Sequence, residues 1–208
     1  MPVLTFPFGP LEANAYLLHN GRDAVVADPP DDPARVLDII RDNHLTLRAI
    51  LLTHLHFDHA GGCAAMSAAT GLPARVGRED WDLRDTLLSG GMLFGLPPVP
   101  AFEADPLEPG PVPAGTWGSL NCTVLHVPGH SPGSLCYYFP EEKALLAGDV
   151  IFYRSVGRTD LPGGDFDTLC RSLRSAVYTL PPDTVIYPGH GEPTTVGSEA
   201  ASNPFCPA

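Results

Sequence analysis

The sequence of 208 residues is poor in cysteine and contains no long hydrophobic run. Its five cysteines are scattered and form no CxxC pair, which predicts neither a disulfide scaffold nor a cysteine-based zinc site. We expect reduced thiols at Cys63, Cys122, Cys136, Cys170 and Cys206. No stretch approaches the roughly 20 apolar residues of a membrane helix, and the first residues lack the pattern of a signal peptide. We therefore expect a cytoplasmic protein that does not bind membranes.

Basic residues are also scarce. Only 12 Lys and Arg residues oppose 24 Asp and Glu residues, which gives a formal net charge of -12. Such a surface repels phosphate backbones, so nucleic acid is excluded as an expected partner. The same charge slows the approach of anionic substrates, unless metal ions or a local basic residue reverse the field at the site.

Predicted strands and predicted helices are interspersed along the chain. Short apolar runs around the turn Asn20-Gly21 predict a β-meander at the N-terminus. A helix pattern follows, with Asp32 as its N-cap and Pro33 at its first position, and then a buried central strand over residues 49–53. Further helices are predicted over 63–70, 78–88 and 166–178, and further strands over 73–77, 122–127, 134–139, 143–149 and 184–188. This order predicts one domain over residues 1–208 with an α/β fold, a sandwich with sheets inside and helices outside.

The segment from Gly90 to Gly115 is rich in glycine and proline and is too long for an ordinary connection. Long ordered loops of this kind often cover a site. A surface loop without a functional role explains the segment equally well, and the sequence leaves both interpretations open.

Three of the eight histidines fall in the segment Thr53 to His59, "THLHFDH". Imidazole binds zinc, iron and similar ions through a neutral ring nitrogen, and carboxylates supply negative charge. His54 and His56 are separated by one residue, so both can turn toward one ion where a strand ends. Asp58 and His59 are adjacent, and on a sharp turn both could reach a second ion.

Three further candidates, His130, Asp149 and His190, follow predicted strands in the same way. A surface cluster or a set of unrelated core histidines is the alternative explanation. The concentration of these residues at strand ends, where α/β folds carry their sites, favours ligands for two metal ions.

The segments "THLHFDH", "PGHSPGS", "AGDVIF" and "YPGHGEPT" resemble, in this order, the successive motifs of the metallo-β-lactamase superfamily. The resemblance extends over roughly Ala15 to Thr195. It implies a four-layer αββα sandwich with a metal site at one edge of the two sheets. By motif position it implies a first metal ion held by His54, His56 and His130, a second held by Asp58, His59 and His190, and Asp149 as the bridge between them.

Within the superfamily, "SVGRTDLPGGDFDTLCRSL" and "GHGEPTTVGSEAASNPF" resemble the small glyoxalase II-like hydrolases. This implies hydrolysis of a small-molecule thioester, such as S-lactoylglutathione or a related acyl thioester, with two divalent ions. Zinc is the first choice, and iron or manganese are options. Full-length glyoxalase II enzymes grip glutathione with a C-terminal helical extension that has no counterpart here. Antibiotic-hydrolysing members are exported and carry a cysteine at the position of Asp149, so we do not expect that activity.

The resemblance implies a reaction in which metal-bound hydroxide attacks the thioester carbonyl. Two neighbouring ions lower the pKa of a shared water from 15.7 toward ~7. Asp149 would hold the ions at the required spacing, and Asp58 would accept a hydrogen bond from the hydroxide as well as ligating, which makes these two the predicted catalytic residues. A thiol with a pKa of ~8.5 leaves as thiolate without a general acid.

Two other functions stay open at this point. The motif "GRTD" also resembles persulfide dioxygenases, which would use a single iron held by His54, His130 and Asp149. A metal-stabilised binding module would instead show closed coordination by protein ligands. Arg158 and Asp160 in the same motif form either a structural ion pair or a pair in which Arg158 orients a metal-ligating carboxylate. The sequence predicts no oligomeric state.

Overall fold

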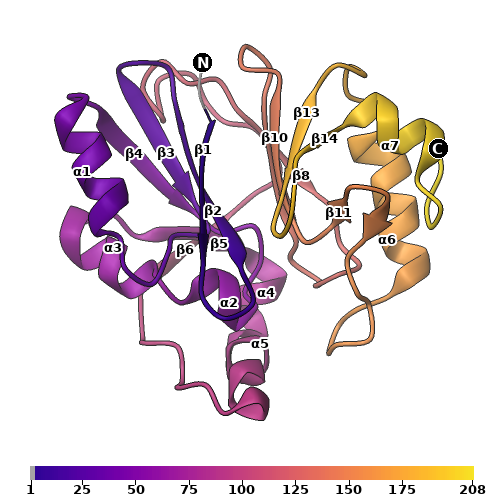
Figure 1. The fold of residues 1–208 in the computed structure, drawn as a ribbon, viewed down its shortest axis with the longest axis horizontal. Coiled ribbons are helices and arrows are strands. Elements are labelled where there is room, and N and C mark those ends of the chain that lie inside the picture. Colours follow the sequence, from indigo (N-terminus) through magenta and orange to yellow (C-terminus); the bar gives the residue numbers. More distant parts are fainter. Residues whose placement is uncertain (1–2) are drawn as a thin grey trace.

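A computed structural model describes residues 3–208, which form two six-stranded sheets packed face to face (Figure 1). The first sheet has the order β1-β2-β3-β4-β5-β6. Its strands are β1 (Val3–Phe8), β2 (Ala13–His19), β3 (Asp23–Ala27), β4 (Thr46–Leu51), β5 (Ala74–Gly77) and β6 (Ala104–Leu107). The first three strands are antiparallel, and β3 to β6 pair in parallel.

The predicted meander at the N-terminus is confirmed, and a short polar turn sets its register. The Asn20 side chain accepts hydrogen bonds from the backbone N–H groups of Arg22 and Asp23, and Gly21 has a φ of 89° that favours glycine. The predicted central strand is β4, which lies between β3 and β5 and is buried at its C-terminal end.

The second sheet has the order β14-β13-β10-β9-β8-β7. Its strands are β7 (Gly110–Pro111), β8 (Thr123–His126), β9 (Leu135–Phe139), β10 (Ala144–Gly148), β13 (Val185–Pro188) and β14 (Thr194–Thr195). A separate hairpin is made of β11 (Ile151–Phe152) and β12 (Ser155–Val156). Strands β10 and β13 are parallel, so their C-terminal ends lie at the same edge.

Helices cover the outer faces of both sheets, with α1 and α3 on one side and α6 and α7 on the other (Figure 1). The helical segments are α1 (Ala34–Asp42), α2 (Phe57–Ala60), α3 (Cys63–Thr70), α4 (Arg78–Asp82), α5 (Arg84–Leu88), α6 (Phe166–Ser172) and α7 (Val196–Ser202), with a 3-10 helix η1 (Ser89–Phe94) and a π-helix η2 (Leu173–Val177). Within residues 3–208, no helix has the length and apolar character needed to cross a membrane.

Three hydrophobic clusters separate the four layers. Val36 and Met66 pack α1 and α3 against the first sheet, and Leu169 and Leu173 pack the α6 side against the second. Between the sheets lies a third cluster that includes Leu51, and the hydroxyl of the buried Tyr137 there donates a hydrogen bond across to the carbonyl of Leu52. The predicted αββα sandwich is therefore confirmed.

Several local expectations differ from the structure. The helix expected over 78–88 is two short helices interrupted at Leu83, and α7 was not expected. At the start of α1 the N-cap is Pro33, one residue after the position expected, while Asp32 still accepts a hydrogen bond from the N–H of Ala34. The segment Gly90–Gly115 is not one loop, because it contains most of η1, the edge strand β6 and the short strand β7.

The expectation of five reduced cysteines is wrong for two of them. Cys170 in α6 forms a disulfide with Cys206, and their Cα atoms are 5.3 Å apart. The chain turns back after α7, where the Asn203 side chain accepts hydrogen bonds from the backbone N–H groups of Phe205 and Cys206, and this return brings the two sulfurs together. Cys63, Cys122 and Cys136 are free and buried, as expected.

Candidate metal centre

The seven residues singled out in the sequence lie together at one edge of the sandwich. Four of them, His54, His56, Asp58 and His59, follow β4 of the first sheet. The other three follow strands of the second sheet and are His130 after β8, Asp149 after β10 and His190 after β13. The site is therefore built from both sheets, at the ends where their strands stop.

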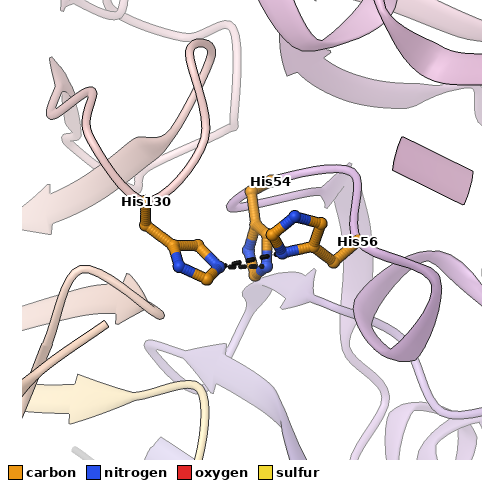
Figure 2. Close-up of side chains that lie close together, drawn as sticks. All are labelled: His54, His56 and His130. Atoms are coloured by element: carbon orange, nitrogen blue, oxygen red, sulfur yellow. Dashed lines mark hydrogen bonds between the residues drawn. The ribbon is translucent and has the colours of Figure 1, made fainter. Parts of the chain in front are cut away.

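His54, His56 and His130 direct three ring nitrogens toward one point (Figure 2). Nε2 of His130 lies 2.9 Å from Nδ1 of His56 and 3.2 Å from Nε2 of His54. Three nitrogens bound to a tetrahedral zinc ion at ~2.0–2.1 Å would be about 3.3 Å apart. The spacing of these rings fits a single metal ion between them.

In His130 and His54, the ring nitrogen that faces away from the site forms a hydrogen bond. This leaves the nitrogen that faces the site free to bind a metal ion. Nδ1 of His130 donates to the carbonyl of Arg158 at 2.8 Å. The Thr53 hydroxyl donates to Asp28 at 2.7 Å and lies 3.0 Å from Nδ1 of His54. Since the hydroxyl proton is already used, Thr53 accepts the proton of His54 Nδ1. In both histidines Nε2 therefore keeps its lone pair for a metal ion.

Asp58, His59 and His190 form a second group beside the first. Nε2 of His190 lies 3.4 Å from Oδ2 of Asp58, and Nε2 of His59 lies 3.8 Å from the same oxygen. Asp58 and His59 belong to the single turn of α2 rather than to the sharp turn expected from the sequence, and the short helix still allows both to reach this position. The outer nitrogen of His190 donates to the carbonyl of Leu11 at 3.0 Å.

The Asp149 carboxylate lies between the two groups. Its Oδ1 is 3.4 Å from Nε2 of His59, and its Oδ2 is 3.7 Å from Nε2 of His130 and 3.5 Å from Nε2 of His190. One carboxylate that faces both groups is the arrangement a bridging ligand requires. Gly189 makes this approach possible, because a Cβ at that position would collide with Oδ1 of Asp149.

The pKa values of the first group suit metal ligation. Burial lowers the pKa of His54, and the neighbouring imidazoles lower it further. Burial likewise lowers the pKa of His56, to about 3. Both rings are therefore neutral at physiological pH and offer a lone pair.

In the second group, neighbouring carboxylates determine the direction in which the histidine pKa is shifted. Burial opposes a charge on His59, but Asp149 and Asp28 raise the pKa of its ring well above the usual value. Burial alone would raise the pKa of Asp149, but the adjacent rings of His59 and His130 lower it. In the protein without metal a proton on His59 supplies the positive charge that a metal ion supplies when bound, so metal binding displaces that proton.

Three buried atoms of the seven site residues lack hydrogen-bond partners among the described residues: Nε2 of His56, Nε2 of His59 and Oδ1 of Asp149. The last two face each other across 3.4 Å. Leaving buried polar atoms without partners costs free energy, and a ligand between them removes the cost. Together with the donor set of imidazoles and carboxylates, this observation fits divalent metal ions.

Two acidic residues that support the site were not identified from the sequence. Asp28 follows β3, is fully buried and accepts hydrogen bonds from His59 Nδ1 at 2.9 Å and from Thr53. Its position at the end of a strand beside β4 is the signal that could have revealed it. Asp80 in α4 is also buried and accepts from the N–H groups of Leu55 and Gly133, and no pattern in the sequence marks it.

Other residues named from the sequence have more limited roles. The Arg158 guanidinium pairs with Asp160 at 2.7 Å in an exposed position, so its contact with the site is made by its backbone carbonyl alone. Beside His130, the Ser131 hydroxyl donates to Asp80 at 2.8 Å, which gives this hydroxyl a structural role.

A sandwich with a histidine and aspartate metal site at the common edge of its sheets defines a class of metalloproteins. The chain belongs to the Metallo-beta-lactamase superfamily, whose family model matches residues 8–190.

Among its relatives, a probable metallo-hydrolase, YqgX of Bacillus subtilis, is 39% identical over 96% of this chain and 94% of its own length. The hydroxyacylglutathione hydrolase GloC of Haemophilus influenzae is 34% identical over 99% of this chain and 98% of its own length.

Two solved structures are similar over their whole length. The BLEG-1 B3 metallo-beta-lactamase has a TM-score of 0.89 and 39% identity, covering 100% of both chains. TTHA1623 in a di-iron-bound form has a TM-score of 0.85 and 41% identity, covering 99% of this chain and 100% of its own.

Proposed function

We propose that this protein is a hydrolase with two divalent metal ions that cleaves an acyl thioester, such as S-lactoylglutathione. The observation that carries the proposal is the assembly of a complete second group, Asp58, His59 and His190, next to the three histidines of the first. The relative named as a hydroxyacylglutathione hydrolase, 34% identical over nearly the whole chain, supports the choice of substrate class.

In this proposal the seven residues divide as their geometry groups them. His54, His56 and His130 would hold the first ion, Asp58, His59 and His190 would hold the second, and Asp149 would contact both. Zinc is the proposed native metal, with iron or manganese as alternatives, because imidazole and carboxylate sites accept all three. The di-iron form of a structure that is 41% identical supports a pair of ions in such a site.

When bound, two such ions would supply a Lewis acid for the thioester carbonyl and would lower the pKa of a bound water. The contribution of the protein is to orient the histidines that would bind the ions. The carbonyl of Arg158 and the Thr53 hydroxyl orient His130 and His54. The thiolate product leaves without a protonating residue, since its pKa of ~8.5 makes it a good leaving group.

The cytoplasmic location and the small-molecule partner remain part of the proposal. The persulfide dioxygenase alternative uses one iron and leaves the second group without a role. A β-lactam is a second candidate substrate, because the similar BLEG-1 structure is that of a B3 metallo-beta-lactamase. The relative named as a hydroxyacylglutathione hydrolase remains our argument for the thioester.

The test is metal analysis combined with activity on one preparation purified without a histidine tag. We expect close to two metal ions per chain together with hydrolysis of S-lactoylglutathione or a short acyl thioester. A nitrocefin assay and oxygen uptake with glutathione persulfide run in parallel. One iron per chain with oxygen uptake and no hydrolysis would replace the proposal by the dioxygenase, and nitrocefin turnover alone would replace it by the β-lactamase.

A further inference from the structure

A cavity of about 350 Å³ opens directly beside Asp58. Its walls come from the tip of the β1–β2 hairpin, from α2 and from the segment Leu96–Pro100, which follows η1. The apolar side chains lining it include Phe8, Leu11, Phe57, Leu96, Pro98 and Val99. Its size is within the ~300–1,000 Å³ range of small-molecule sites.

The cavity is connected to the metal centre through two of its walls. Asp58 belongs both to the lining and to the second ligand group. Leu11, at the hairpin tip, accepts the hydrogen bond from His190 through its carbonyl, so the same short segment contacts a metal ligand and borders the cavity. A molecule held at the metal centre by its carbonyl can therefore extend a substituent into this cavity.

The charge of the lining disfavours anionic groups. Among the described residues its ionisable side chains are Asp31 and Asp58, and no Lys, Arg or His belongs to it. A metal ion bound by Asp58 would neutralise that carboxylate, so Asp31 supplies the negative charge of the lining. Asp31 packs against Gly61, where a Cβ would collide with its carboxylate, so this negative charge is held at the wall. A carboxylate of glutathione or of a succinyl group would meet repulsion here, whereas an apolar group gains from leaving water.

We infer that this cavity, referred to below as the apolar cavity, binds an uncharged apolar substituent of the thioester, on either its acyl or its thiol side. The inference rests on the proposed thioesterase function and adds to it a preference for thioesters with a hydrophobic substituent. It also gives the proline-rich segment Leu96–Pro100 the task of forming one wall of the substrate site.

Two substrate series on the metal-loaded protein test this selectivity and identify the side of the thioester concerned. The first varies the acyl group from acetyl to octanoyl on the neutral thiol N-acetylcysteamine. The second keeps acetyl and varies the thiol from methyl to hexyl. In the series whose variable part enters the cavity, each methylene should raise kcat/KM about fourfold, the ratio for ~0.8 kcal/mol, until the cavity is full. The succinyl thioester should be poorer than the pentanoyl one.

Variants of the wall supply the control. Leu96→Asp should remove the dependence on chain length, so that kcat/KM falls most for the longest substituent and least for the acetyl thioester. Leu83→Asp, an exposed leucine outside the cavity lining, should keep the full dependence. Asp31→Lys should improve the succinyl substrate, whereas Glu103→Lys, the same charge change outside the lining, should not.

Binding of a thioether analogue, S-hexyl-N-acetylcysteamine, measured by calorimetry gives a readout that needs no turnover. We expect binding to the unmodified protein and weaker binding to Leu96→Asp. Hydrolysis of every thioester at a rate independent of chain length would overturn the inference and leave the proposed function intact. Absence of hydrolysis for every thioester would overturn the proposed function. The inference would then depend on the binding measurement alone: weaker thioether binding to Leu96→Asp would support it, and equal binding would overturn it.

Discussion

Nδ1 of His59 donates a hydrogen bond to the carboxylate of Asp28, 2.9 Å away in a fully buried position. The same carboxylate accepts the N–H and the hydroxyl of Thr53, whose hydroxyl in turn contacts His54. One acidic residue at the end of β3 thus orients a histidine in each of the two ligand groups. Such outer contacts fix the ring orientation and raise the basicity of the nitrogen that faces the metal.

Replacing Asp28 by Asn should lower metal affinity about 10-fold to 100-fold, because the His59 ring loses its charged partner. A competition titration with a chelator measures the change. Asp38→Asn, on the exposed face of α1, is the matched control and should leave the affinity as it was. An unchanged affinity in the Asp28 variant would show that Asp28 does not tune the site.

His190→Ala should reduce the metal content to about one ion per chain and abolish thioester hydrolysis, while the fold is retained. His190 is partly exposed, and the loss of its hydrogen bond to Leu11 should cost only about 1 kcal/mol. His126→Ala, at a histidine that belongs to neither ligand group, removes a similar bond, to the carbonyl of Pro132, and is the control. Turnover at the unmodified rate in the His190 variant would contradict the two-metal mechanism.

Asp80→Ala should lower the free energy of unfolding by about 3 kcal/mol or more. The buried carboxylate accepts bonds from the N–H groups of Leu55 and Gly133 and from the Ser131 hydroxyl, and its removal leaves these donors without a partner. Ser131→Ala should cost less, since only one donor is lost. Urea unfolding of both variants measures the difference, and equal losses would argue against Asp80 as the organising residue.

The stability of the fold should depend on Asp23 at acidic pH. Hydrogen bonds from Ser119 and Arg48 lower the pKa of this buried carboxyl from 3.8 to about 2. Because the folded pKa is below the unfolded one, the ionised group stabilises the fold above about pH 4, and this contribution is lost as the pH falls toward about 2.

Asp23→Asn should therefore be less stable by about 2 kcal/mol at pH 7, with a gap that narrows below pH 4. Urea midpoints measured between pH 2.5 and 7 give the comparison. A gap that stays constant over this range would exclude the ionisation of Asp23 as its origin.

The disulfide between Cys170 and Cys206 should stabilise the folded protein by about 2–4 kcal/mol, since it closes a loop over a sequence separation of 36 residues. Thermal unfolding of the unmodified protein should shift downward on addition of a reductant. Cys170→Ser should unfold at the lower temperature with or without reductant. A transition of the unmodified protein that does not respond to the reductant would mean that the bond contributes little.

The main features of the fold could be predicted from the sequence because they follow local rules, whereas the division of the candidate ligands into two groups was implied by the family resemblance. Apolar runs and turn residues define β4 and β10, and His54 and Asp149 stand out because each follows a strand. Asp28 also follows a strand, but this position was the only signal for it in the sequence, because no histidine lies beside it in the chain.

The remaining features depend on contacts between distant parts of the chain. Asp80 gains its role only because α4 packs beside the loop that carries Ser131 and Gly133. The pairing of Cys170 with Cys206 requires the return of the chain after α7, which has no hydrophobic pattern of its own. The apolar cavity depends on the position of Leu96–Pro100 against α2, and a proline-rich composition does not specify that position.

The division of the ligands between the two sheets has a mechanical consequence. His54 and His130 are 76 residues apart in the chain, yet one ion would be attached to both. Bound metal would thus act as a cross-link between the first and second halves of the protein, at the edge where strands of both sheets end. Opening of that edge, the motion that exposes the space between the sheets, would then require a ligand bond to break first.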